Sequence, residues 1–241
     1  MKAEPAGLGR NRLLAVLSDD ERRRLASDLE LVDLPLREVL YKQGQPIEHV
    51  FFPVNGVISL VSEMQDDRMI EVATVGNEGM IGLPVFLQAT LTSSQTALSQ
   101  LPGQALRMPA DRFAEYVDSA ERLHRVLHHY TQALISQIAQ NAACNMAHSV
   151  EQRAARWLLM TRDRVTSDSF ELTQEFLAQM LGANRTTVTA VEQKFQEDGL
   201  ITYSRGRATI VDRDGLKGRA CECYRVVMHE FARLLDPENN R

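Results

Sequence analysis

The sequence predicts an α+β protein in which a double-stranded β-helix (a jelly roll) precedes a long helix and a C-terminal winged helix-turn-helix. Three observations carry this prediction. Short apolar segments separated by turn residues fill residues 30–108, an apolar repeat in steps of three and four follows to residue 147, and two short helical patterns meet at a glycine within residues 172–199. We divide the chain into a β-roll domain (12–118), a long helix (119–148), a winged helix-turn-helix (149–215) and a C-terminal helical extension (216–241).

The composition is that of a globular protein with two modest domains. The chain has 241 residues, of which 44% are hydrophobic, and this length is enough for a substantial core. Its apolar runs are too short to span a bilayer, and the N-terminus shows no signal-peptide pattern. The three cysteines are irregularly spaced and form no disulfide framework. We therefore expect a reduced, cytoplasmic protein without membrane association.

The net charge of −5 does not itself indicate nucleic-acid binding, but the charge is unevenly distributed. Residues 151–220 hold 11 Lys and Arg against 10 Asp and Glu, a balance of +1. The rest of the chain holds 16 against 22, a balance of −6. Because phosphate contacts depend on local patches more than on total charge, the C-terminal half is the better candidate for such contacts.

Seven segments of residues 30–108 have the short apolar pattern of strands. Turn signals separate them, including Gly44, Pro53 to Gly56 and Pro102-Gly103. Many short strands at this spacing favour a small barrel or jelly roll over βαβ units. The expected strands are Glu30–Leu34, Val39–Tyr41, His49–Phe52, Gly56–Glu63, Arg68–Val75, Gln95–Leu101 and Gln104–Met108.

The long helix carries an apolar seam that is longer than packing inside one small domain requires. We interpret it as a dimerisation helix. The alternative is a long core helix that covers a sheet of its own domain. The seam comprises Leu123, Leu127, Tyr130, Leu134 and Ile138, continued by Ala142 and Met146.

Residues 172–199 have the pattern of two helices joined by a tight turn. Thr173 suits the N-cap of the first helix, Gly182 its left-handed C-cap, and Asn184 the N-cap of a second helix that starts at Arg185. This is the helix-turn-helix pattern, and the second helix presents Arg, Thr and Gln on its polar face. Residues 201–211 then predict two strands around Ser-Arg-Gly-Arg, a basic wing. A final helix is expected over residues 216–235.

These motifs together resemble the cyclic-AMP receptor protein/FNR (Crp/Fnr) superfamily of bacterial transcription regulators. The resemblance covers residues 13–211. It rests on YKQG at 41–44, VFFPVNG at 50–56 and GMIGL at 79–83, and more specifically on LTQE at 172–175, LGANRTTV at 181–188 and DGLI at 198–201. It implies a β-roll effector or sensor domain, subunit pairing through the long helix, and a dimer on a near-palindromic operator with half-sites about one helical turn apart.

The second helix supplies the expected base contacts. The fork of Arg185 matches the O6 and N7 acceptors of guanine, and Thr186 and Thr189 could contact bases or thymine methyl groups. Ala190 stands where well-known family members have a second base-reading Arg, so the operator should differ from theirs. The expected phosphate contacts are Thr173, Thr187, Gln193, Lys194, Arg205 and Arg207. For each threonine, capping or packing is an equal alternative.

The family's cyclic-nucleotide anchors are missing. The Gly-Glu-Leu segment that holds the ribose maps to Gly79-Met80-Ile81, and the Arg-Ser/Thr-Ala segment that holds the phosphate maps to Gln95-Thr96-Ala97. Met80 and Gln95 cannot replace a carboxylate and a guanidinium. The effector pocket formed by Gly79, Met80, Gln95 and Thr96 is therefore degenerate, and we expect no control by cyclic AMP.

No cofactor or metal site is expected. The chain has no cysteine before Cys144, which excludes the N-terminal cluster of the family's iron–sulfur sensors. Cys144, Cys221, Cys223 and His229 could be zinc ligands, but the i, i+2 spacing on an expected helix points the last two thiols apart. His124, His128 and His129 lack a recognisable further ligand. No arrangement of nucleophile and base is recognisable, so an enzyme is not expected.

The sequence thus predicts a DNA-binding transcription regulator that acts as a homodimer. Its expected partners are a double-stranded DNA operator and a second copy of the chain, with RNA polymerase as a further candidate and the effector unknown. Three alternatives remain: a β-roll sensor or interaction module that has lost DNA binding, a regulator that responds to another small molecule or to a redox signal, and a cupin-like enzyme. The last would need metal-binding histidines on the strands, where His49 is the only one.

Overall fold

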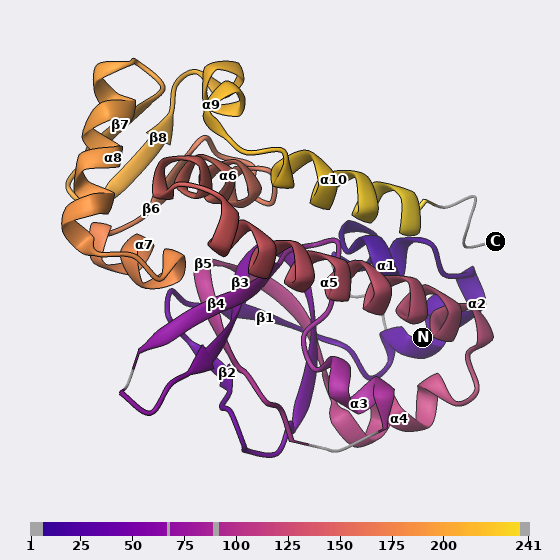
Figure 1. The fold of residues 1–241 in the computed structure, drawn as a ribbon. Coiled ribbons are helices and arrows are strands. Elements are labelled where there is room, and N and C mark those ends of the chain that lie inside the picture. The colour runs from indigo at the N-terminus through magenta and orange to yellow at the C-terminus, as the bar shows by residue number, and fades with distance from the viewer. Residues whose placement is uncertain (1–6, 67, 89–91, 237–241) are drawn as a thin grey trace.

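The N-terminal half of the molecule is an antiparallel β-roll. A computed structural model describes residues 7–66, 68–88 and 92–236. The roll sheet has the order β1-β5-β3-β4, and β2 also pairs with β5 (Figure 1). Its strands are β1 Glu30–Leu34, β2 Val39–Tyr41, β3 His49–Glu63, β4 Met69–Val75 and β5 Thr96–Pro109.

Two strands are longer than the sequence predicted. The turn signals at residues 53–56 and 102–103 do not end strands, because β3 and β5 pass through them as bulges with register shifts. Gly56 has φ 84° there, and Gly103 lies so close to the backbone of Asn55 that a Cβ would not fit. Each glycine thus allows its strand to continue through a bulge. The two strands predicted on either side of residues 53–56 are therefore one strand, β3, and the two predicted on either side of residues 102–103 are one strand, β5.

Helices enclose the roll at one end and connect it to the C-terminal part. They are the 3₁₀ helix Leu8–Arg10, α1 Arg12–Ala15, α2 Asp19–Ala26, α3 Leu83–Leu87, α4 Ala110–Val117, α5 Glu121–Ala147, α6 Val150–Arg162, α7 Gln174–Leu181, α8 Arg185–Glu197, α9 Arg213–Arg219 and α10 Cys223–Leu234. A second sheet, in the order β6-β8-β7, accompanies α7 and α8; its strands are β6 Ser169–Glu171, β7 Ile201–Ser204 and β8 Arg207–Ile210. In the described part of the chain, none of the helices is long and apolar enough to cross a membrane.

Most of the predicted dimer seam faces the interior of its own chain, which corrects its assignment. Leu123, Leu127, Tyr130 and Leu134 are all at most 5% exposed. The Tyr130 hydroxyl donates to the Met80 carbonyl at 2.9 Å, so this face of α5 is fixed to the roll. Further along α5, the side-chain amides of Gln137 and Asn141 donate to backbone carbonyls of β4 at 3.1 and 2.9 Å. The end of the seam differs, because Ile138 is half-buried and Ala142 and Met146 are exposed.

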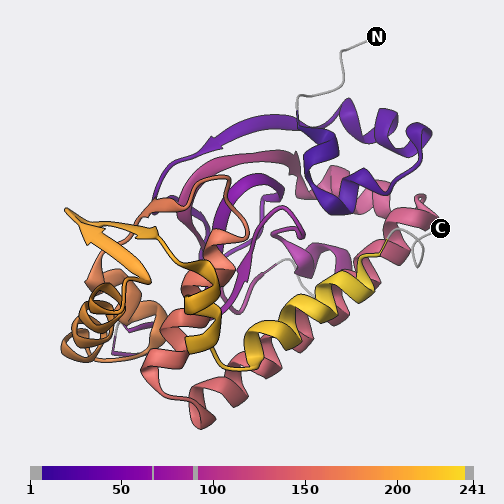
Figure 2. The ribbon, with the colours of Figure 1, turned by 90° about the horizontal axis from the view of Figure 1, so that it is seen from above.

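The C-terminal extension forms two helices where one was predicted. The chain leaves α9 at Ala220, which is extended (φ −73°, ψ 149°), and α10 begins at Cys223. Helix α10 then runs alongside α5 (Figure 2). The rings of Phe231 on α10 and Tyr130 on α5 lie 6.5 Å apart. The extension therefore covers a second face of the long helix.

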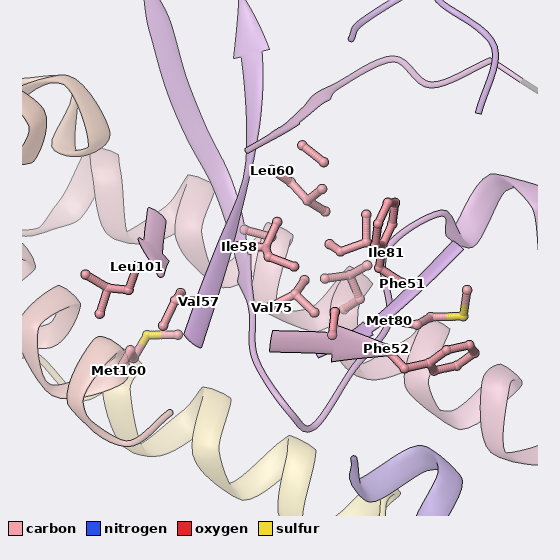
Figure 3. Packing of buried hydrophobic residues seen from close by; sticks show 14 of the residues in the cluster. Phe51, Phe52, Val57, Ile58, Leu60, Val75, Met80, Ile81, Leu101 and Met160 are labelled. Carbon is pink, nitrogen blue, oxygen red and sulfur yellow. The ribbon is translucent and has the colours of Figure 1, made fainter. Parts of the chain in front are cut away.

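The core continues from the roll into α6. Met160 of α6 belongs to the same buried cluster as Val57 and Leu101 of the roll (Figure 3). Near the end of α6, a buried ion pair joins Arg164 to Glu78 at 2.7 Å. The C-terminal part thus packs directly on the roll.

Candidate nucleic-acid interface

Local sequence signals position α7 and α8. The Thr173 hydroxyl caps α7 by accepting from the Phe176 amide at 3.1 Å. Gly182 ends the helix with φ 56°, a conformation that costs glycine little. Asn184 is the N-cap residue of α8, although its side chain makes no capping bond. Val188 and Phe195, both fully buried, fix the orientation of α8.

One face of α8 is exposed along its length. Thr186, Ala190 and Gln193 lie on the face opposite Val188 and Phe195. At the N-terminal end, the Arg185 side chain is 66% exposed, and its guanidinium lies 3.7 Å from the Glu175 carboxylate. An ion pair this long and solvated is worth little, so the guanidinium can be redirected to a ligand. The protruding face has the dimensions and chemistry of a helix that enters a major groove.

Thr189 is less available than the sequence suggested. Its side chain is partly buried, and its hydroxyl can donate its one proton either to the Gln174 side-chain oxygen at 3.0 Å or to the Arg185 carbonyl at 2.9 Å. The Gln174 contact links α8 to α7, which is the packing alternative considered for each threonine. Nearby, burial raises the pKa of Glu192, a side chain that is 1% exposed on the inner face of α8.

The expected phosphate contacts occupy different positions around this face. Lys194 pairs with Glu151 of α6 at 2.7 Å, and Gln193 donates to Glu197 at 3.2 Å. Thr187 is exposed next to them. Thr173, Arg205 and Arg207 instead line a cavity of about 340 Å³ between the wing and the Leu36-Arg37 turn of the roll. The roll thus borders the wing side of the interface in this conformation.

Another basic residue lies beside α8 that no sequence pattern indicates. Arg68, directly before β4, lines an open cavity of about 600 Å³ together with Asn184 and Arg185. It pairs with Asp66 at 2.7 Å, and both side chains are largely exposed. Only the folded arrangement of α7 against β4 brings this cation near the start of α8.

The degenerate effector pocket is small and uncharged. Met80 and Gln95 line a cavity of about 180 Å³ between the roll and α5, below the roughly 300–1,000 Å³ of typical ligand sites. Among the residues that the structure describes, none that lines this cavity carries a charge. Thr96 does not line it, because its hydroxyl accepts from the Gln43 amide at 2.8 Å and contacts Glu63. Gly79 is also absent from the lining and packs against Tyr130.

The structure also locates the histidines and cysteines that were considered as metal ligands. The rings of His124 and His128 on α5 contact Phe86 edge-on at centroid distances of 5.3 and 5.2 Å. His229 does not join the cysteines; His148 does, in a cluster with all three.

Comparisons with known proteins agree with this architecture. Residues 31–120 match the cyclic nucleotide-binding domain, and residues 152–219 match the Crp-like helix-turn-helix domain. A CRP-like cAMP-activated global transcriptional regulator of Mycobacterium tuberculosis is 24% identical over 204 residues, covering 81% of this chain and 90% of the relative. The HTH-type transcriptional regulator Cmr of the same species is 26% identical over 215 residues, covering 86% and 82%.

Solved structures share the fold. FixK2 from Bradyrhizobium japonicum superposes with a TM-score of 0.67 at 15% identity, covering 80% of this chain and 98% of its own. The c-di-GMP responsive global regulator CLP from Xanthomonas campestris superposes with a TM-score of 0.65 at 17% identity, covering 80% and 99%.

Proposed function

Since this chain belongs to the Crp/Fnr family of DNA-binding transcription regulators, we propose that it acts as a homodimer on a near-palindromic operator and that cyclic AMP does not control it. The observation that carries the proposal is the exposed face of α8, which begins with the solvated guanidinium of Arg185. A DNA-binding regulator works where the chromosome lies, so we place the protein in the cytoplasm.

Base recognition is assigned to the exposed face of α8. Arg185 reads a guanine through its two-pronged donor set, and Thr186 contacts a neighbouring base edge or thymine methyl. Ala190, one turn further along, offers only an apolar contact. Thr189 contributes through its methyl group, since its hydroxyl is engaged with Gln174 or Arg185.

Contacts to phosphates fix the position of the protein along the DNA duplex. Thr187, Gln193 and Lys194 flank the exposed face of α8, and Lys194 would exchange its Glu151 partner for a phosphate. Thr173, Arg205 and Arg207 would contact phosphates on the wing side, where all three border the roll. Their use on DNA requires the C-terminal domain to move away from Leu36-Arg37, with residues 147–150 between α5 and α6 as the hinge.

Dimerisation is assigned to the face of α5 that the chain leaves uncovered. Its side chains follow steps of three and four residues, as a helix pair requires. Ile135 is 60% and Met146 is 92% exposed, an unusual exposure for large apolar side chains. The stripe consists of Ile135, Ile138, Ala139, Ala142 and Met146.

Selection of bound duplexes from a random DNA pool tests the proposal. We expect a near-symmetric consensus whose half-sites lie about one helical turn apart, without added cyclic AMP. With Arg185→Ala, affinity should fall by roughly 1–3 kcal/mol at one base pair of each half-site and little elsewhere. Lys194→Ala should weaken all sequences similarly. Absence of any enriched sequence would instead favour an interaction module without DNA binding.

A further inference from the structure

All three cysteines of the chain meet one histidine at the end of the long helix. Cys144 lies in the last turn of α5 and His148 directly after that helix, while Cys221 precedes α10 and Cys223 begins it. One potential ligand atom of each residue lies within 4.8 Å of the others. The three thiols are buried and are not in disulfides. The residues come from two segments more than 70 positions apart in the chain.

Backbone breaks create this convergence. On a continuous helix, Cys221 and Cys223 would point to different sides, as expected from the sequence. The extended conformation of Ala220 separates α9 from α10, so Cys221 lies outside either helix. At the other segment, His148 is extended (φ −116°, ψ 148°) and turns its ring back toward α10. The objection to a metal site based on helical spacing therefore does not apply.

Two of the six distances between ligand atoms are close to the edges of a tetrahedral site. Ligand distances of about 2.3 Å for sulfur and about 2.0 Å for nitrogen place two sulfurs about 3.8 Å apart and a sulfur and a nitrogen about 3.5 Å apart. The Cys144 and Cys221 Sγ atoms are 3.5 Å apart, and the Cys223 Sγ lies 3.5 Å from His148 Nδ1.

Neighbouring groups orient the ligands. The Nε2 atom of His148 lies 3.3 Å from the Glu222 carboxylate, which leaves Nδ1 directed at the thiols. A carboxylate on the far ring nitrogen is the usual support of a metal-binding histidine. The side-chain amide of Gln140 donates to the Cys223 Sγ at 3.0 Å, as it would to a thiolate.

Buried positive charge lies beside the thiols. Arg156 lies close enough to the Cys144 thiol for the two groups to interact electrostatically. Arg153 and Arg156 are both under 10% exposed, and among the described residues neither Nε atom has a hydrogen-bond partner. Three thiolates and one divalent ion carry a net charge of −1, which these guanidinium groups offset.

We propose that Cys144, His148, Cys221 and Cys223 form a closed, structural Zn²⁺ site. Thiolate and imidazole ligands select zinc over magnesium or calcium, and four protein ligands leave no open position for catalysis. On binding, each thiol releases its proton to solvent and His148 binds through the Nδ1 lone pair. The ion joins the end of α5 to α10. A Cys144–Cys221 disulfide is the competing chemistry, but it would leave Cys223, His148 and Glu222 without a role.

Cobalt substitution tests the site in the full-length protein. The chain is purified under reducing conditions, stripped with a chelator, and titrated with Co²⁺ and then Zn²⁺. We expect intense visible bands of a tetrahedral thiolate complex at one ion per chain, bleached by zinc. Cys144→Ser and Cys223→Ser should abolish the bands, whereas His229→Ala, on the same helix as Cys223, should retain them.

A further variant tests the site without removing a ligand, in case the cysteine variants do not fold. Glu222→Gln keeps all four ligands and should lower zinc affinity about 10–100-fold in a chelator competition while the fold is retained. Zinc should also raise the thermal midpoint of the wild type but not of Cys223→Ser. A folded, reduced wild type that gives no cobalt bands would overturn the proposal. So would a Cys144–Cys221 disulfide that forms equally fast with and without zinc when a thiol oxidant is added to the reduced protein.

Discussion

The Arg164 guanidinium lies 2.7 Å from the Glu78 carboxylate, with the two side chains only 6% and 8% exposed. The same guanidinium donates to the Met160 carbonyl at 2.9 Å, and Glu78 accepts from the Gly76 amide at 3.2 Å. A Cβ on Gly76 would collide with the Arg164 side chain. One ion pair thus connects the turn directly after α6 to the loop that leads into the effector pocket.

Removing this arginine should be costly. Arg164→Met leaves Glu78 buried without its partner, and we expect a loss of about 3–5 kcal/mol in the free energy of unfolding. Arg162→Met is the matched control, since Arg162 also pairs with an acid at 2.7 Å but in a largely exposed setting. It should cost under about 1 kcal/mol. Urea denaturation of both variants measures this, and equal losses would contradict the assigned role of burial.

A second contact between the domains should depend on pH. Burial raises the pKa of Glu71 to about 7, although hydrogen bonds from Ser59 and Trp157 act against this shift. When Glu71 is protonated it can donate to Ser59, across 2.6 Å, while accepting from Trp157 at 3.0 Å. Ser59 is then free to donate to Gln100 at 2.8 Å. The protonated acid therefore completes the network.

The sign of the effect follows from the raised pKa. At pH values between the ordinary glutamate pKa of 4.5 and about 7, the folded state binds the proton more tightly than the unfolded state. The free energy of unfolding should therefore fall as pH rises through this window, by up to about 1.4 kcal/mol per pH unit from this group. Glu71→Gln mimics the protonated acid, so its free energy of unfolding should lack this pH-dependent contribution. The test is urea denaturation at several pH values; parallel curves for both proteins would contradict the assignment.

The seam of α5 shows what periodicity can and cannot predict. Steps of three and four correctly indicated a long helix, but the same spacing is produced by packing on a roll or on a partner. The deciding contacts are polar, because Gln137 and Asn141 bind carbonyls of β4 and so mark the inward face. Such contacts between residues over 60 positions apart have no periodic signal. The fold class was therefore predictable, whereas the assignment of each helix face was not.

The same limit applies to the interface and the cysteines. Caps at Thr173 and Gly182 are local, so the helix-turn-helix could be placed from the sequence alone. The approach of Arg68 to α8 depends on tertiary packing. No proline marks the helix break at Ala220, and the nearby Gly218 lies within α9. This break brings Cys221 and Cys223 to the same site.

The exposed stripe of α5 predicts a dimer that a single charge should weaken. Ile135→Glu would place two carboxylates in the proposed helix pair, and we expect at least a tenfold rise in the dimer dissociation constant, about 1.4 kcal/mol. Gln132→Glu, one turn earlier and also exposed, should change it less. Sedimentation equilibrium measures both. A monomeric wild type, or a dimer unaffected by Ile135→Glu, would refute the assignment of this face.

Cyclic AMP should not bind, and one substitution should partly restore binding. The cavity of about 180 Å³ offers the cyclic phosphate no cation, and hydrogen bonds to charged groups are worth roughly 1.5–3 kcal/mol each. Calorimetric titration should therefore show no binding at micromolar nucleotide, with the cAMP-activated mycobacterial relative as the positive control.

Gln95→Arg returns a guanidinium to the cavity wall and should improve the affinity for cyclic AMP at least about tenfold, because one charge-assisted contact supplies about that much. Gln88→Arg, exposed and outside the lining, should have no such effect. Micromolar binding by the unaltered chain would show that Met80 and Gln95 do not disable the pocket.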